Sequence, residues 1–109
     1  MVYIMATNWF PAQQAKAFGK RVLEGLKKYP EDKTIAKNVF RGGVAASEEG
    51  IKVITLVEVV KGQIEKALAR TNEAGIWYAE GIDGYKYKIE TLMSAAEAMG
   101  TIGLKMPED

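Results

Sequence analysis

The segment Ile51–Val60, IKVITLVEVV, carries the strongest strand signal in the sequence. Side chains alternate between the two faces of a strand, and here both faces are apolar. The two sets are Val53, Val57 and Val59 on one face, and Ile54, Leu56 and Val60 on the other. A strand that is apolar on both sides should be covered on both sides. One layer of helices covers only one face, so the other face predicts contact with a second copy of the chain.

The sequence before this strand begins with a strand and a helix. Residues 2–10 are apolar and aromatic, which predicts a first strand that Pro11 ends. Residues 11–28 predict a helix, because apolar residues recur every three or four positions. The expected inner face consists of Ala15, Phe18, Val22, Leu26 and Tyr29. The face expected in solvent carries Lys16, Lys20, Arg21, Lys27 and Lys28.

A second strand is expected between this helix and the Ile51–Val60 strand. Residues 33–46 predict that strand, with a kink or bulge at Gly42–Gly43. The polar loop 47–50 ends in a glycine and predicts a hairpin turn.

After the Ile51–Val60 strand, residues 61–74 predict a second helix, with terminating residues between Asn72 and Gly75. Residues 76–84 predict either a loop over the sheet or a short strand paired with the next one. Residues 85–93 alternate in polarity and predict the last strand.

The C-terminal segment predicts a short helix, because Ser94 and Glu97 fit a capping box. This helix should stop near Gly100, and the tail after it should fray. We expect a single α+β domain over residues 1–109, with its core in 2–93 and the short helix and tail in 94–109.

The strand-helix-strand-strand-helix-strand order predicts a ferredoxin-like antiparallel sheet with two helices on one face. With its second apolar face and the stretch Met5–Phe10, MATNWF, the chain resembles the dimeric α+β barrel superfamily over residues 2–93. That group includes antibiotic-biosynthesis-type monooxygenases. The resemblance implies a homodimer in which two sheets pack together. It also implies a pocket between sheet and helices that Asn8 would line.

The amino-acid composition excludes several kinds of catalytic and metal site. The chain has no cysteine and no histidine, which excludes disulfides, thiolate sites, histidine bases and most transition-metal sites. It therefore departs from the haem-degrading branch of the superfamily, and we expect no metal and no cofactor. A formal charge of +1 predicts no nucleic-acid or membrane partner, and no apolar run is long enough for a membrane span. The expected location is the cytoplasm.

Two groups of side chains are candidates for ligand binding. Asn8 could bond a substrate oxygen and Trp9 could stack on a ring, although both residues also suit a capping turn or an interface. Four aromatic residues crowd into eleven positions and could wall a pocket or form a dimer contact. They are Trp77, Tyr78, Tyr85 and Tyr87.

Catalytic candidates are Glu58 and Tyr85. Glu58 lies within the most apolar strand, where burial would raise its pKa and favour a general base. The alternatives are an ion pair with Arg41 in the adjacent predicted strand, or a carboxylate that reaches solvent at the end of the strand. Arg41 could instead hold a carboxylate or phosphate.

Three functions follow as hypotheses. The first is a homodimeric protein that binds a small apolar or aromatic molecule. The second is a cofactor-independent oxygenase, isomerase or lyase acting on an aromatic or carbonyl compound. The third is a non-catalytic ligand-sensing or interaction module.

Overall fold

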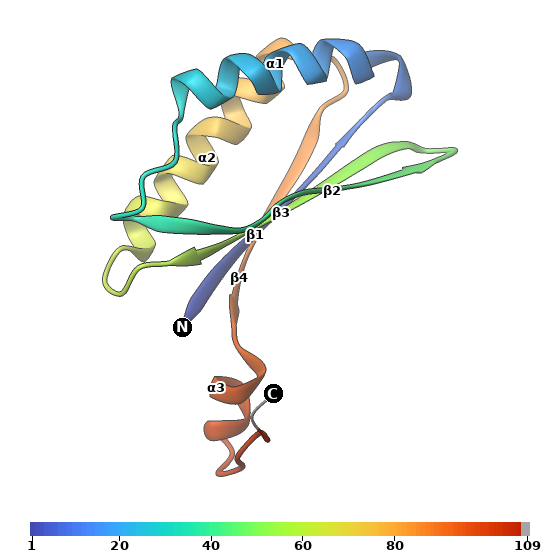
Figure 1. The fold of residues 1–109 in the computed structure, drawn as a ribbon. Helices are drawn as coiled ribbons and strands as arrows, with labels where there is room; N and C mark the ends of the chain where they lie inside the picture. The colour runs from blue at the N-terminus through green and yellow to red at the C-terminus, as the bar shows by residue number, and fades with distance from the viewer. Residues whose placement is uncertain (108–109) are drawn as a thin grey trace.

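A computed structural model describes residues 1–107 of the protein. Four strands form one antiparallel sheet in the order β2-β3-β1-β4. The strands are β1 (Val2–Phe10), β2 (Ala36–Ser47), β3 (Gly50–Val59) and β4 (Lys86–Met93). The helices are η1 (Ala12–Gln14), α1 (Ala15–Lys28), α2 (Ile64–Gly81) and α3 (Ala95–Gly100). Figure 1 shows α1 and α2 on one face of the sheet. The predicted ferredoxin-like fold is confirmed.

The register of the sheet confirms the two faces expected for β3. Ile4 of β1 pairs with Val57 and packs in the core with Val59 and Ala67, so these side chains face the helices. Leu56, one residue earlier than Val57, pairs with Met5 and therefore points to the opposite face. No helix of residues 1–107 covers that face, as Figure 1 shows.

The inner face of α1 differs from the prediction. Leu26 is 58% exposed, whereas Gly25 is buried. A Cβ atom on Gly25 would lie 2.7 Å from the Tyr78 hydroxyl and 3.0 Å from the Trp77 ring. The close approach of α2 at this glycine therefore fixes which stripe of α1 faces inward, and the stripe rotates away from Leu26.

Helix α2 is longer than expected. It continues to Gly81, so neither alternative for residues 76–84 is correct, and Trp77 and Tyr78 are helical. The expected stop at Gly75 fails because that glycine has a packing role in the middle of the helix. A Cβ atom there would lie 2.7 Å from the Tyr87 ring of β4.

This close contact gives the first testable prediction. In a helix interior, glycine to alanine normally stabilises by about 0.5–1 kcal/mol. We expect Gly75→Ala to destabilise instead, by about 1–3 kcal/mol, because the methyl group overpacks against Tyr87. Gly19→Ala in α1 is the matched control, since its Cβ meets no atom within 4 Å and should stabilise the fold. Urea unfolding measures both, and a stabilised Gly75→Ala variant would contradict this role.

The irregular part of β2 and the hairpin turn between β2 and β3 lie where the sequence predicts them. The register of β2 against β3 shifts between Asn38 and Phe40 and again between Phe40 and Gly43, which confirms the predicted irregularity. Gly50 closes the hairpin with a φ of 125°, a conformation that glycine adopts readily.

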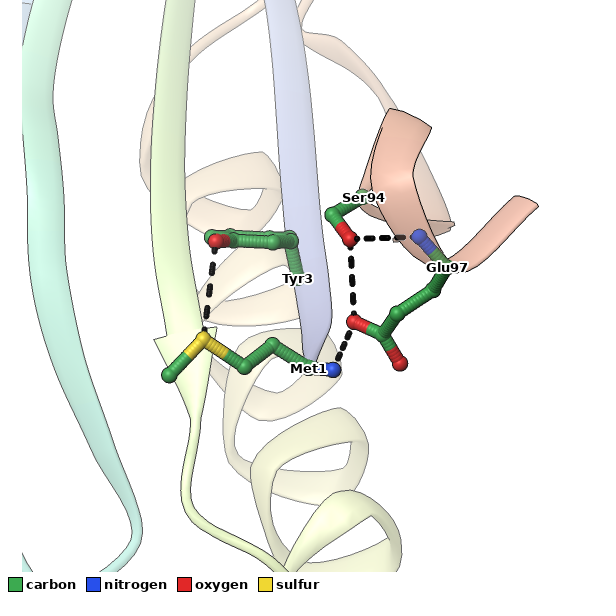
Figure 2. A network of polar contacts seen from close by, with 4 residues as sticks. All are labelled: Met1, Tyr3, Ser94 and Glu97. Carbon is green, nitrogen blue, oxygen red and sulfur yellow. Dashed lines mark hydrogen bonds and ion pairs between the residues drawn. The ribbon is translucent and has the colours of Figure 1, made fainter. Parts of the chain in front are cut away.

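The C-terminal helix begins as predicted. The Ser94 hydroxyl accepts a hydrogen bond from the Glu97 backbone N–H at 3.1 Å. The Glu97 carboxylate also pairs with the N-terminal amine of Met1 (Figure 2). Figure 1 shows α3 projecting from the end of β4, away from α1 and α2. The predicted fraying concerns a tail whose residues 108–109 lie outside the described chain. No helix of residues 1–107 is long and apolar enough to cross a membrane, and the cytoplasmic location stays a prediction.

Candidate functional site

A polar pair lies between the sheet and the helices. Asn8 of β1 pairs in the sheet with Val53 and Tyr87, on the face that the helices cover. The Tyr85 hydroxyl donates a hydrogen bond to Asn8 Oδ1 at 2.5 Å. Asn8 Nδ2 donates to the Val53 carbonyl at 3.4 Å. The side-chain amide is therefore held from both ends, with its oxygen toward the phenol.

Aromatic rings surround this pair. The Phe18 ring of α1 stacks on Phe10 with centroids 4.2 Å apart and lies 6.3 Å from Tyr85. Tyr85 in turn lies 5.9 Å from both Tyr78 and Tyr87. We call this set, with Trp77 beside Tyr78, the aromatic cluster; its members are Phe10, Phe18, Trp77, Tyr78, Tyr85 and Tyr87. All but Phe10 are only partly buried, so solvent reaches its rings.

The environment of the cluster keeps its phenols protonated. Burial raises the pKa of Tyr85 well above the ordinary value of 10.0, and the neighbouring Tyr78 and Tyr87 raise it further. Burial also raises the pKa of Tyr78, although the Arg21 guanidinium partly offsets that effect. A phenol with a raised pKa is a poor source of phenolate. The site therefore favours hydrogen-bond donation by Tyr85 over proton abstraction.

Arg21 is a part of this region that the sequence did not reveal. It lies inside the α1–α2 contact, not on the solvated face expected for it. Its Nη2 donates to the Trp77 carbonyl at 2.5 Å, and its guanidinium lies 3.8 Å from the centre of the Trp77 ring. Its Nε is buried with no hydrogen-bond partner among the described residues. Its spacing of three from Phe18 and four from Gly25 could have indicated this inward position.

The other predicted residues lie elsewhere. Trp9 lies on the uncovered face of the sheet and is 38% exposed. Glu58 lies on that same face, opposite Tyr3 and Lys37, so the sheet separates it from Asn8. Its role as a general base stays a prediction.

The sequence indicated an ion pair between Arg41 and Glu58, but the structure does not contain it. It lies in the irregular part of β2, where the register shift leaves it without a partner residue on β3. Its side chain is 73% exposed and lies 3.8 Å from the Glu31 carboxylate. The structure therefore brings together Asn8, Tyr85, Tyr78, Tyr87 and Trp77, but not Trp9, Arg41 or Glu58.

Two shallow grooves lie on the surface. One, of about 510 Å³, runs along the end of the sheet between Val2, Val59 and Ile64. The other, of about 440 Å³, lies beside Arg41 and Glu31. Neither groove is lined by Asn8 or Tyr85. Within residues 1–107, no group of three or more acidic side chains is placed to hold a metal ion.

The uncovered face of the sheet, which we call the open face, is a large and partly apolar surface. Cross-strand partners share a face, so the register identifies its members. They are Tyr3, Met5, Thr7 and Trp9 of β1, Lys52, Ile54, Leu56 and Glu58 of β3, Lys86, Lys88, Glu90 and Leu92 of β4, and Lys37, Phe40, Gly43 and Ala45 of β2. Its centre is apolar on β1, β2 and β3, whereas Lys88 and Glu90 of β4 lie opposite Thr7 and Met5 in the middle of the face.

No family model and no curated protein matches the sequence. The solved structures that are similar in fold include the following three proteins. A dimeric ferredoxin-like protein from an uncultured marine organism aligns with a TM-score of 0.60 at 12% identity, over 86% of this chain and 94% of that one. A Caulobacter crescentus CB15 protein described as a "putative antibiotic biosynthesis monooxygenase" aligns with a TM-score of 0.50 at 17% identity, over 86% and 89%. The de novo designed protein Foldit4 aligns with a TM-score of 0.53 at 13% identity, over 85% and 96%. These likenesses confirm the fold shared with dimeric ferredoxin-like proteins. A designed protein has the same fold, so the fold by itself does not identify a function.

Proposed function

We propose that the chain is a homodimer of the α+β barrel type that binds a small, flat organic molecule at the aromatic cluster. The observation that carries the ligand site is the hydrogen-bonded pair of Asn8 and Tyr85 among partly buried rings. Small-molecule sites are usually apolar and aromatic with a few placed polar groups, and this cluster has that composition.

The dimer is supported by how much surface the single chain exposes. Its accessible area is 7691 Å², whereas a compact monomer of 12.0 kDa exposes about 6,000 Å². Its radius of gyration is 15.6 Å, against about 13 Å for a compact domain of this length. The excess includes the projecting α3 and exceeds the roughly 800 Å² that each partner buries in a standard interface. The dimeric ferredoxin-like neighbour supports the same assembly.

The chemistry of the pair indicates what the ligand presents. The Tyr85 hydroxyl can donate to a ligand oxygen, and Asn8 can then turn its released amide oxygen toward a ligand hydroxyl. The rings of Phe18 and Tyr78 would stack on a flat apolar body. An aromatic compound with one oxygen function fits this arrangement better than a purely apolar one.

A pair of probes tests this function. Calorimetric titration should show wild-type protein binding 2-naphthol more tightly than 2-methylnaphthalene, which has similar shape but no hydroxyl. One hydrogen bond corresponds to a preference of about 2–12-fold. The double variant Tyr85→Phe/Asn8→Leu should remove that preference, because it removes both partners of the ligand oxygen.

Tyr3→Phe is the matched control for this variant. It also removes a phenol hydroxyl, but from the open face on the other side of the sheet, so it should leave the preference unchanged. If neither probe binds, or if Tyr85→Phe/Asn8→Leu keeps the wild-type preference, this site is not the binding site.

A second candidate is a cofactor-independent oxygenase, isomerase or lyase acting at the same place. The fold likeness to the Caulobacter protein favours it. In this reading Tyr85 would donate a hydrogen bond to an oxyanion that develops on the substrate. Oxygen consumption with a bound phenol would support the enzyme function. Binding without turnover would reject the enzyme function and retain the ligand-binding function.

A further inference from the structure

The charges of the open face are divided along the strands. Near the end of β1 that carries Trp9, the face holds Lys52, Lys86 and Lys88. Toward the opposite end it holds Glu58 and Glu90, with Lys37 on the outer strand beside Glu58. The apolar side chains between them include Met5, Ile54, Leu56 and Phe40. The face therefore has a basic half, with three lysines, and an acidic half, with two glutamates and Lys37. On β1, β2 and β3 an apolar centre lies between them.

Two identical sheets can meet face to face in two symmetric ways. A two-fold axis parallel to the strands would place like ends together, with six lysines at one end of the interface and four glutamates and two lysines at the other. A two-fold axis across the strands reverses one sheet relative to its partner and places unlike ends together. Like charges brought together in a partly dehydrated interface are strongly unfavourable.

We propose that two copies pair through the open face with the two-fold axis across the strands. Each basic half then lies over the acidic half of the other copy. The inference rests on the homodimer proposed above and adds the orientation of its partner. Glu58 lies toward the partner's Lys52, and Glu90 lies toward the partner's Lys88. Met5 and Leu56 lie near the axis, where Leu56 packs against the partner's Ile54 and Met5 against the partner's Thr7.

The intrachain pairing of the charges is compatible with this arrangement. Lys88 Nζ lies 3.6 Å from Glu90 Oε1, so this pair stands at the boundary between the two halves. The partner's pair would complete a four-charge network there. Lys52 and Lys86 have no carboxylate within 4.0 Å in the described part of the chain, which leaves them free for the partner.

Neutralising the glutamates of the acidic half tests the orientation, because the two orientations predict opposite changes in the dissociation constant of the dimer. The double variant Glu58→Gln/Glu90→Gln keeps side-chain shape and removes two charges. With unlike ends together, the dimer loses attraction, and its dissociation constant should rise about tenfold. With like ends together, the same variant would relieve repulsion and tighten the dimer. Sedimentation equilibrium at low salt measures the constant.

The control variant Glu24→Gln/Glu80→Gln removes the same number of charges from exposed residues of α1 and α2. It should leave the dissociation constant within about twofold of wild type. Circular dichroism confirms that both double variants are folded.

A reversed pair of chains provides a second readout. Glu58→Lys/Glu90→Lys and Lys52→Glu/Lys88→Glu should each dimerise poorly alone and recover near wild-type affinity when mixed, because each new lysine then faces a new glutamate. An unchanged or tighter dimer in the glutamine variant overturns the orientation while the homodimer stands. A monomeric wild-type chain overturns the homodimer and the orientation together.

Discussion

Replacing Leu56 by aspartate should convert the dimer into a monomer. Leu56 lies near the centre of the open face, between Met5 of β1 and Phe40 of β2. In a symmetric dimer the change introduces two carboxylates into the apolar centre, where neither has a basic partner. Burying an unpaired charge is costly enough that the dissociation constant should rise by about 100-fold or more. Sedimentation velocity of the variant beside the wild type measures this result.

Val44→Asp is the matched control for Leu56→Asp. Val44 is also a strand residue and is 71% exposed, but it pairs with Val53, on the other face of the sheet. The same charge placed there should leave the dimer intact. Equal weakening by both variants would show that aspartate acts through the stability of the hairpin and not through the open face.

The second large effect concerns the core. Ile4→Ala should destabilise the protein by about 2–5 kcal/mol, because it removes three heavy atoms from a side chain that packs on all sides. Ile4 is 1% exposed and lies against Val59 and Ala67 beneath α2. Urea unfolding at fixed protein concentration measures the change, since dissociation is linked to unfolding in a dimer.

Ile76→Ala in α2 is the control for the core variant. Ile76 is 46% exposed, so its truncation should change the free energy of unfolding by about 0.5 kcal/mol or less. A loss below about 1 kcal/mol for Ile4→Ala would mean that this core contributes little and that the interface supplies most of the stability.

The strands of this fold could be predicted well because their signals are local. Residues 2–10 and 51–60 carry dense apolar alternation, and the observed β1 and β3 match those ranges within one residue. The Ser94 cap is equally local, because its bond joins residues three apart. Each of these features depends only on side chains that are neighbours along the chain.

The end of α2 could not be predicted because its signal is a tertiary contact. Gly75 reads as a helix terminator in isolation, yet its missing side chain makes room for Tyr87 of β4. The spacing of Arg21 from Phe18 indicates an inward position, but its partners, the Trp77 carbonyl and ring, belong to another helix and could not be predicted. The expected pair of Arg41 and Glu58 does not form, because the register shift of β2 leaves Arg41 without a partner residue on β3. The sequence predicted an irregularity in this strand but not which residues it would leave unpaired.

The candidate site was predicted as separate residues and not as an arrangement. Asn8 and Tyr85 were both candidates, but 77 positions separate them, and no local pattern joins them. Only the pairing of β1 with β4 brings the two side chains to one place. By contrast, the two apolar faces of β3 were evident from alternation, and the covered and open faces follow from them.

The central claim is that the open face is closed by a second copy of the chain. Sedimentation equilibrium of the full chain at low micromolar concentration tests it most directly. We predict a single species of twice the 12.0 kDa chain mass, with the Trp9 indole shielded from a polar fluorescence quencher. A stable monomer in which Trp9 is quenched as freely as an exposed indole would contradict the account.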